Sequence, residues 1–170
     1  MIEETVSTVT TRLATAADAD HISALVHEVV PTLGYGPDEA VAWFIREQYS
    51  PDVVRAGIDD GSHRWVVAVR TGVEESSAPV CGAIYLNAGE RYFGGLHVRE
   101  RRQGTGRVLM DVMVADADEL GIETLRGSVL GTNTAMLALT TRYGFRITGE
   151  DPYKVYFPAA PFMIITRDLQ

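Results

Sequence analysis

The chain has 170 residues, enough to bury a sizeable hydrophobic core within one compact α/β domain. Hydrophobic residues make up 46% of it and charged residues 22%, which is ordinary for a soluble globular protein. The net charge of −8 argues against a nucleic-acid-binding surface, which usually carries a basic patch, and it suits a cationic substrate.

The N-terminal residues and the single cysteine bear on where the protein works. Residues 1–12 include acidic side chains and lack the apolar core of a signal peptide, and no apolar run reaches the length of a membrane span. The lone cysteine, Cys81, cannot form an internal disulfide, which fits a reducing compartment. We therefore expect a cytoplasmic protein with no membrane partner. We also expect the Cys81 thiol to pack within its apolar strand rather than to act as a nucleophile.

The first third of the chain is predicted to form a strand followed by helices. Alternating apolar and polar residues predict a strand at Thr10–Ala14, and Asp18 or Asp20 is placed to cap the helix after it. A second helix begins near Asp38, Pro51 interrupts it, and a further helical turn follows. This aromatic, loop-rich segment is of the kind that shapes a substrate pocket, although aromatic residues at helical spacing more often belong to a core.

The rest of the chain is predicted to build a sheet around two more helices. Strands are expected at Arg64–Arg70, Val80–Asn87, Tyr92–Val98, Thr124–Leu130, Phe145–Gly149 and Phe162–Arg167. Polar or glycine-containing turns join the first three as an antiparallel meander. A helix from about Thr134 to Tyr143 is capped by Thr132 or Asn133, and a loop rich in proline and aromatic residues spans 151–161. This order predicts an α/β (α+β) fold forming a single domain over 1–170, with its core at about 10–167.

The stretch Gly94–Gly121 carries the strongest chemical signal. It predicts a strand end, a turn with two glycines, and an amphipathic helix with a glycine cap at its C-terminus. Such a turn leaves unpaired main-chain N–H groups at the start of the helix, where the helix dipole also favours negative charge. Arg101, Arg102 and Arg107 surround this point with further donors. The pattern predicts an anion site whose natural occupant is a pyrophosphate.

Three phosphate-binding motifs place glycines in a turn of this kind. The string of a Walker loop does not occur, and a dinucleotide fingerprint would need a third glycine where Leu109 stands. The pattern Arg/Gln-x-x-Gly-x-Gly/Ala is met by residues 101–106, RRQGTG. This string resembles the acetyl-CoA loop of the GCN5-related N-acetyltransferases (GNAT family). A plain strand-to-helix turn that uses glycine for backbone freedom is the competing interpretation.

A second motif extends the resemblance over nearly the whole chain, from about Thr10 to Arg167. The family's later helix commonly reads Asn-x-x-Ala-x-x-x-Tyr-x-x-x-Gly-Phe, and Asn133 and Gly144-Phe145 match it at the right spacing. Met136 replaces the small residue, and Thr140 stands where the tyrosine usually does. The resemblance implies the GNAT fold, in which a mixed, mostly antiparallel central sheet is flanked by helices.

The resemblance implies acetyl-CoA (CoA) as the cofactor. Its pantetheine arm would lie between the central strand and Thr124–Leu130, which would splay apart, and main-chain N–H groups of 102–107 would hold the pyrophosphate. A side chain at Gly104 or Gly106 would obstruct the phosphates. Asn133 would bind the pantetheine or order its walls. The implied cofactor-binding residues are Leu96, His97, Val98, Arg101, Arg102, Gln103, Gly104, Thr105, Gly106, Arg107, Asn133 and Thr140.

The chemistry implied by the resemblance is direct transfer of an acetyl group to an amine. A strand N–H near Leu96 or Val98 would stabilise the developing oxyanion. The acceptor is expected to be a small-molecule amine, and the alternatives are a protein lysine or N-terminus. A non-catalytic acyl-CoA-binding or regulatory module is the rival from another class, and acetylation of charged tRNA is disfavoured by the acidity. The family often forms homodimers, which nothing in the sequence requires.

Two residues are candidates for the base that removes the amine proton. Glu90 precedes the central strand and could face the cleft through water, although a charged turn residue is the commoner role. His97 has a pKa range suited to a base and points away from Leu96 and Val98, although a packed strand histidine is at least as common. The base is left unassigned between them.

The sequence also leaves several candidates for the acid that would protonate the leaving thiolate. Thr140 has a weakly acidic hydroxyl and a short reach, so it is a poor substitute for the family's tyrosine. Tyr143 or Tyr92 could take the role, or the thiolate could leave unaided because it is stable near neutral pH. Tyr143 is the main candidate, although packing is the commoner role for a residue directly before Gly144.

The spacing before the anion loop departs from the family pattern as well. If the central strand ends at Val98, only Arg99 and Glu100 separate it from the motif, two residues fewer than usual. Either Leu96 occupies the usual position at the strand end or the loop is short.

Overall fold

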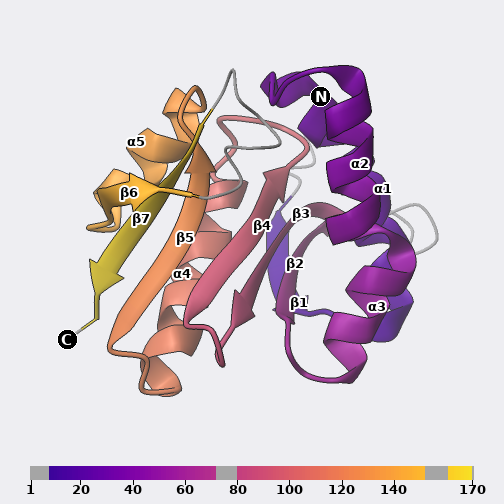
Figure 1. Ribbon diagram of the computed structural model, residues 1–170. Coiled ribbons are helices and arrows are strands. Elements are labelled where there is room, and N and C mark those ends of the chain that lie inside the picture. The colour runs from indigo at the N-terminus through magenta and orange to yellow at the C-terminus, as the bar shows by residue number, and fades with distance from the viewer. Residues whose placement is uncertain (1–7, 72–79, 152–160, 170) are drawn as a thin grey trace, which may run out of the picture.

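The computed structural model describes residues 8–71, 80–151 and 161–169 (Figure 1). Within them, seven strands form one sheet in the order β1-β2-β3-β4-β5-β7-β6. The strands are β1 (Val9–Leu13), β2 (Arg64–Arg70), β3 (Val80–Asn87), β4 (Tyr92–Val98), β5 (Thr124–Leu130), β6 (Arg146–Glu150) and β7 (Phe162–Asp168). The helices are α1 (Ala19–Val29), α2 (Asp38–Tyr49), α3 (Pro51–Asp59), α4 (Thr105–Glu119) and α5 (Thr134–Arg142).

The sheet is mixed and mostly antiparallel, as predicted. Among the described strands only β4 and β5 run parallel, and the other neighbouring strands pair antiparallel. The predicted meander of β2, β3 and β4 is confirmed, and those three strands have the predicted bounds. Segments 72–79 and 152–160, which include most of the predicted loop at 151–161, lie outside the described residues.

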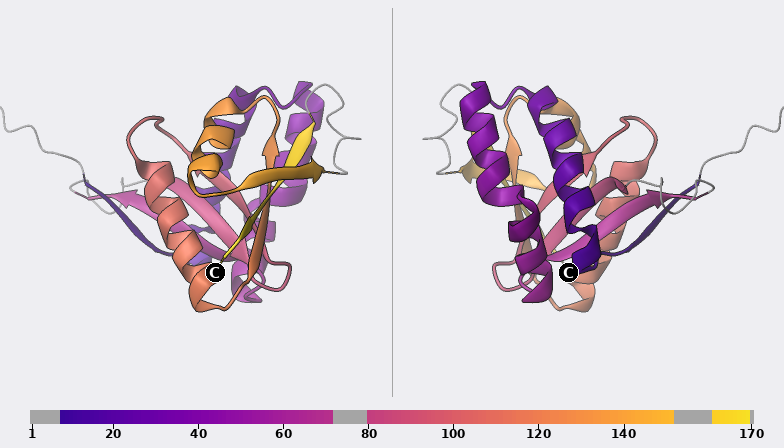
Figure 2. Two further views of the ribbon diagram at one scale, coloured as in Figure 1. Left: turned by 90° about the vertical axis from the view of Figure 1, so that its left-hand side faces the viewer. Right: turned by 90° about the vertical axis from the view of Figure 1, so that its right-hand side faces the viewer.

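Each face of the sheet carries its own hydrophobic core because side chains of a strand alternate between the two faces. In β2, Trp65 and Val67 join the core beneath α1, α2 and α3, whereas Val66 and Ala68 join the core beneath α4. Figure 2 shows the α1–α3 layer and α4 on opposite sides of the sheet. No helix in the described part of the chain is both long and apolar enough to cross a membrane.

A local sequence signal accounts for the boundary between α2 and α3. Pro51 stands at the first position of α3, where a missing N–H costs nothing, and so divides it from α2.

Asp18 does not cap α1 with its side chain. Instead its carboxylate accepts hydrogen bonds from the main-chain N–H of Thr15 and from Arg12, both at 2.8 Å. The Arg12 guanidinium holds the pKa of Asp18 below its usual value, so this ion pair ties β1 to the start of the helical layer.

The cysteine packs as predicted. Cys81 is buried in β3, and its thiol donates to the main-chain oxygen of Ala68 at 3.3 Å. Burial raises the pKa of the thiol, which disfavours the nucleophilic thiolate.

The sheet opens where its two parallel strands meet. β4 and β5 pair only at Tyr92↔Arg126 and Phe93↔Gly127, near the beginning of β4. Beyond these pairs the strands diverge toward their C-terminal ends (Figure 1). The central strand and β5 therefore splay apart, as the resemblance implied.

Candidate active site

A glycine bulge shapes β4 at the point where it leaves β5. The register between β3 and β4 shifts by one residue between Ala83 and Tyr85, so β4 carries an extra residue there. Gly95 has φ +61°, and a Cβ at this position would lie 2.6 Å from a ring carbon of Trp65. A Cβ on Gly94 would lie 2.6 Å from the Tyr85 hydroxyl oxygen. Glycine at both positions lets the two aromatic rings lie directly on the strand.

The end of β4 presents main-chain groups to the splay. The N–H of Arg99 donates to the oxygen of Cys81 in β3 at 2.9 Å. Because successive residues of a strand direct their main-chain groups to opposite sides, the N–H of Val98 faces β5 instead. The described part of β5 does not pair with β4 at this level. Val98 therefore offers a donor to whatever lies between the strands.

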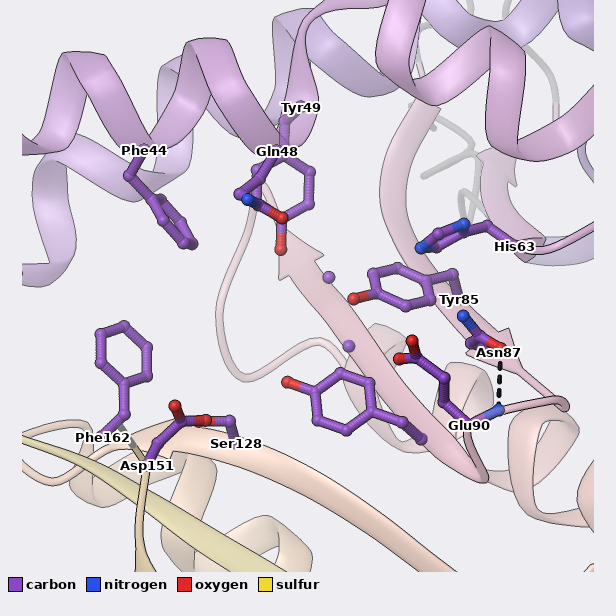
Figure 3. A pocket seen from close by; sticks show the side chains of 13 residues that line it. Phe44, Gln48, Tyr49, His63, Tyr85, Asn87, Glu90, Ser128, Asp151 and Phe162 are labelled. Carbon is purple, nitrogen blue, oxygen red and sulfur yellow. Dashed lines mark hydrogen bonds between the residues drawn. The ribbon is translucent and has the colours of Figure 1, made fainter. Parts of the chain in front are cut away.

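A cavity of about 390 Å³ opens on the α2 side of the splay (Figure 3). Residues from α2 form one wall, the β3–β4 hairpin forms a second, and β5 with the segment around β7 forms a third. The floor is the glycine bulge of β4. The lining residues are Phe44, Gln48, Tyr49, His63, Tyr85, Asn87, Glu90, Tyr92, Gly94, Gly95, Ser128, Asp151 and Phe162.

Aromatic rings stand on two sides of this cavity. On one side, Phe44 and Phe162 lie 6.3 Å apart between ring centroids, and Tyr49 packs edge-on against Phe44 at 5.5 Å. On the other side, the rings of Tyr85 and Tyr92 lie 6.4 Å apart. Aromatic rings therefore form part of two walls, and polar side chains such as Gln48, Asn87 and Glu90 complete the lining.

Glu90 is held by its main chain with its carboxylate turned into the cavity (Figure 3). Its N–H donates to Oδ1 of Asn87 at 3.1 Å, and its main-chain oxygen accepts from the Arg126 guanidinium at 3.3 Å. Across the cavity, the buried Asp151 and Ser128 both belong to the lining (Figure 3). The Ser128 hydroxyl oxygen is buried and has no hydrogen-bond partner in the described residues.

His63 is a cavity residue that the sequence analysis missed. Its ring packs against Tyr85 with centroids 4.6 Å apart, and its Nδ1 lies 2.9 Å from the Ser62 hydroxyl oxygen. Burial lowers the pKa of His63, an effect that the charges of Asp60 and Glu90 oppose. Burial therefore favours the neutral form of the ring. No local pattern marks this histidine, because only the packing of the turn after α3 against β3 brings it to the cavity.

His97 lies behind the cavity rather than in it. Its side chain is 95% buried and packs edge-on against Tyr49, with ring centroids 5.5 Å apart. Neither ring nitrogen has a hydrogen-bond partner among the described residues, and burial lowers the pKa of His97 to about 4. The geometry argues against the predicted base role, because Tyr49 stands on the cavity side and the ring resists protonation.

The geometry also argues against the predicted acid role of Tyr143. Its hydroxyl oxygen lies 2.6 Å from Oδ1 of Asp111 and 2.9 Å from the main-chain oxygen of Arg107, both on α4. Burial and the neighbouring Asp111 carboxylate raise the pKa of Tyr143 to about 12. The side chain ties α5 to α4 and does not line the cavity.

The side chain of Thr140 also has a structural role. It is buried, and its hydroxyl donates to the main-chain oxygens of Met136 and Leu137 at 3.0 and 3.1 Å. The hydroxyl proton is directed to main-chain oxygens of its own helix, which argues against a role of Thr140 as the acid.

The anion loop between β4 and α4 has the backbone of a phosphate cradle. β4 ends at Val98 and α4 begins at Thr105, so the loop is short. Arg102 and Gly104 both have positive φ, at 64° and 79°, and Gly104 is the N-cap of α4. Residues in the left-handed region turn neighbouring N–H groups toward one concave point, which the helix dipole makes favourable for an anion.

The charges around this loop divide into paired and unpaired arginines. Arg99 binds Glu28 at 3.0 Å, and Arg70 binds Glu100. Arg101, Arg102 and Arg107 are exposed and form no ion pair in the described part of the chain. The three arginines predicted to serve an anion are thus the ones that the fold leaves available.

A second, smaller hollow of about 160 Å³ joins the loop to the start of α5. It is lined by Thr32, Leu33, Arg101, Thr132, Asn133, Thr134 and Ala135. Asn133 caps α5, as predicted, because its Oδ1 accepts from the N–H of Met136 at 3.1 Å. Arg101 and the cap of α5 therefore face a common space beside the splay.

Comparison with known proteins identifies the fold. No family model and no curated protein sequence matches the chain. The solved paia N-acetyltransferase of Thermoplasma acidophilum in complex with coenzyme A matches with a TM-score of 0.77 at 16% identity, over 95% of this chain and 99% of that one. The ribosomal-protein-S18-alanine N-acetyltransferase of Escherichia coli matches with a TM-score of 0.72 at 15% identity, over 96% and 95%.

A third match, yncA of Salmonella typhimurium with its cofactor acetyl-CoA, has a TM-score of 0.65 at 19% identity, over 95% of this chain and 94% of that one. The protein therefore has the fold of the GCN5-related N-acetyltransferases. The predicted resemblance is confirmed at the level of the fold.

Proposed function

We propose that the protein transfers an acetyl group from acetyl-CoA to the nitrogen of a small-molecule amine. The observation that carries this proposal is the splay of β4 and β5, which has a cavity on one face of the sheet and the anion loop at its end. Two structures with the same fold contain coenzyme A or acetyl-CoA, which supports the same ligand here.

The cofactor would bind donors that the fold leaves available. The N–H groups of residues 102–107 and the unpaired arginines of the loop would hold the pyrophosphate, by charge-assisted hydrogen bonds. Asn133 retains its amide N–H₂ group for the pantetheine, since only its oxygen caps the helix. When bound, acetyl-CoA supplies a thioester whose carbonyl carbon forms a C–N bond to the amine while its C–S bond breaks.

The chain's own contribution to the transition state begins with one residue of β4 beyond the glycine bulge, Leu96 or Val98. Its N–H faces the splay and can donate to the carbonyl oxygen as negative charge develops there. Main-chain donors fixed in this way need no reorganisation during the reaction, so they are effective in a site that excludes water.

Glu90 is the proposed acceptor of the amine proton, directly or through water. It is the predicted base candidate that lines the cavity, whereas His97 is screened by Tyr49. The departing thiolate needs no strong acid because it is stable near neutral pH. Tyr92 is the predicted acid candidate at the cavity and would serve if protonation is required.

The test is acetyl-CoA binding by calorimetry, with desulfo-CoA and ATP for comparison, followed by release of free thiol on a panel of amines. We expect acetyl-CoA to bind with a Kd on the order of micromolar and selectively over ATP. Binding without thiol release on any amine or peptide would favour a non-catalytic acyl-CoA-binding module. Release on peptides alone would point to a protein lysine or N-terminus. Absence of binding would overturn the proposal.

A further inference from the structure

We propose that His63 is a further catalytic residue, whose Nε2 takes the proton that the acceptor's ammonium group must lose to become a free amine. This inference rests on the proposed function and deepens it, because it assigns a second proton acceptor to the same cavity. It is carried by the fixed position of the ring, by the hydrogen bond on its other nitrogen and by the proton balance of the reaction.

Two protons leave the acceptor nitrogen when an alkyl amine is acetylated. The amine is an ammonium ion at pH 7 and has no lone pair for attack, so one proton must leave before the C–N bond forms. The second leaves as the C–N bond forms and the C–S bond breaks, because the product is a neutral amide. Glu90 can hold only one proton at a time. A second acceptor in the cavity therefore lets both protons leave without an exchange with solvent between the two steps.

The His63 ring is held in one place by two elements. Its main-chain N–H donates to the oxygen of Gly57 in α3 at 2.9 Å. A Cβ on Gly57 would lie 2.8 Å from Nδ1 of His63, so the glycine leaves room for the ring. Glycine is unfavourable inside a helix, and this contact is the packing reason for it. The ring also packs against Tyr85 of β3, with centroids 4.6 Å apart.

The hydrogen bond on Nδ1 leaves Nε2 to accept a proton. Nδ1 lies 2.9 Å from the hydroxyl oxygen of Ser62. Hydrogen bonds from the hydroxyl and the main-chain N–H of Ser62 lower the pKa of Asp60, and the N–H bond is 2.8 Å long. Because the hydroxyl donates to Asp60, its oxygen accepts from Nδ1–H of His63, and this tautomer has its lone pair on Nε2.

Nε2 is the ring nitrogen that a ligand in the cavity can reach. His63 belongs to the cavity lining, and Figure 3 shows the nitrogen farther from its Cβ turned toward the interior. Among the described residues, the hydrogen bond of the ring is the one that Nδ1 makes with Ser62. Glu90 turns its carboxylate into the cavity from the same side as His63 (Figure 3). The two proposed proton acceptors therefore face one space.

The surroundings of the ring suit a base that is neutral at rest and charged for part of the cycle. Burial lowers the pKa of His63, and the charges of Asp60 and Glu90 oppose this effect. The groups that α3 and β3 place against the ring are Gly57 and the Tyr85 phenol. Burial thus favours the free base, and the two carboxylates stabilise the imidazolium once it has formed.

In the proposed step a bond forms between Nε2 and a proton while an N–H bond of the ammonium group breaks, directly or through one water molecule. The free amine then attacks the thioester carbonyl carbon, and Glu90 takes the second proton. Before the next turnover the two acceptors release these protons to water and to the departing thiolate. No group other than acetyl-CoA, the amine and water takes part.

Two amines of nearly the same size test this step with saturating acetyl-CoA. Ethylamine is an ammonium ion at pH 7, whereas methoxyamine is neutral because its oxygen withdraws electrons, so only ethylamine needs the first deprotonation. In His63→Gln we expect kcat/KM at pH 7 to fall by about 10²-fold or more for ethylamine and by less than about threefold for methoxyamine. The loss with ethylamine should shrink as the pH rises toward the pKa of that amine. Equal loss with both amines at every pH, or loss with neither, would overturn the inference.

The matched control makes the same substitution at another histidine. His21 is exposed on α1 and lies outside the cavity lining. His21→Gln should leave kcat/KM for both amines unchanged. A selective loss with ethylamine in this control would contradict the assignment to His63.

Nuclear magnetic resonance of the wild-type protein with isotopically labelled histidine separates failure of the inference from failure of the proposed function. The signals that disappear in His63→Gln identify the ring. We expect the Nδ1–H tautomer at pH 7 with coenzyme A bound, whether or not turnover is found. An Nε2–H tautomer or a stable imidazolium at this pH would overturn the inference alone. Absence of acetyl-CoA binding in calorimetry would instead overturn the proposed function.

Discussion

The hydroxyl oxygen of Tyr143 lies 2.6 Å from Oδ1 of Asp111, and this contact joins α5 to α4 beside the anion loop. A hydroxyl placed in this way, with the pKa raised to about 12, contributes to stability rather than to proton transfer. Tyr143→Phe should therefore lower the free energy of unfolding by about 1–2 kcal/mol and leave kcat within a few-fold of wild type. Denaturant melts and steady-state kinetics measure the two effects. A loss of kcat by orders of magnitude with the fold intact would restore the acid role.

Gly104 gives a prediction about the anion loop. A Cβ there would meet no atom within 4 Å, so Gly104→Glu would place its bulk and charge in the open space before the start of α4. We expect acetyl-CoA binding to be abolished, as measured by calorimetry.

The control for this variant is at the other end of the same helix. Gly121 has φ +69° against +79° for Gly104, and it too has no atom within 4 Å of a built Cβ. Both substitutions therefore impose comparable backbone strain, of order 1–3 kcal/mol. Gly121→Glu should bind acetyl-CoA normally, and equal loss in both variants would refute the loop assignment.

The buried His97 predicts a pH dependence of stability. Its pKa is about 4 in the folded protein and near 6.5 when unfolded, so the unfolded chain binds the proton more readily between these values. Stability from this group is therefore full above pH 6.5 and is lost as pH falls toward 4, by up to about 1.4 kcal/mol per pH unit. His97→Phe should flatten this part of the profile, measured by denaturant melts from pH 7 to 4. Parallel profiles for variant and wild type would contradict the prediction.

The position of Glu90 predicts that its substitution lowers kcat without changing the affinity for acetyl-CoA. If it accepts the amine proton, Glu90→Gln should lower kcat by about 10²-fold or more, the usual contribution of a general base. Acetyl-CoA affinity should be unchanged, because Glu90 lies at the cavity and not at the anion loop. A kcat near that of wild type across the pH profile would remove Glu90 from the chemistry.

The elements of the fold could be predicted from local patterns because they depend on near neighbours in the chain. Alternation and turn residues marked β2, β3, β4 and β5 with the bounds that the structure has. The string RRQGTG at 101–106 indicated the anion loop for the same reason, since its glycines and the start of the helix lie within a few residues of one another.

Several other cavity residues were not predictable in this way. His63, Ser128 and Asp151 come from segments far apart in the chain, and none belongs to a local motif. They meet because α2, the β3–β4 hairpin and β5 surround the splay. Long-range packing of this kind leaves no periodic signal in the sequence.

His97 shows most clearly which features depend on the local sequence and which depend on the tertiary structure. The alternation of β4 determined by itself that this side chain would lie opposite Leu96 and Val98, because successive residues of a strand point to opposite faces. Only the tertiary structure decided what covers that face: Tyr49 of α2 packs against the ring and separates it from the cavity. The sequence thus determined the strands, the helices and the anion loop through local interactions. The tertiary structure decided which titratable groups reach solvent and ligand, because burial depends on contacts between segments distant in the chain.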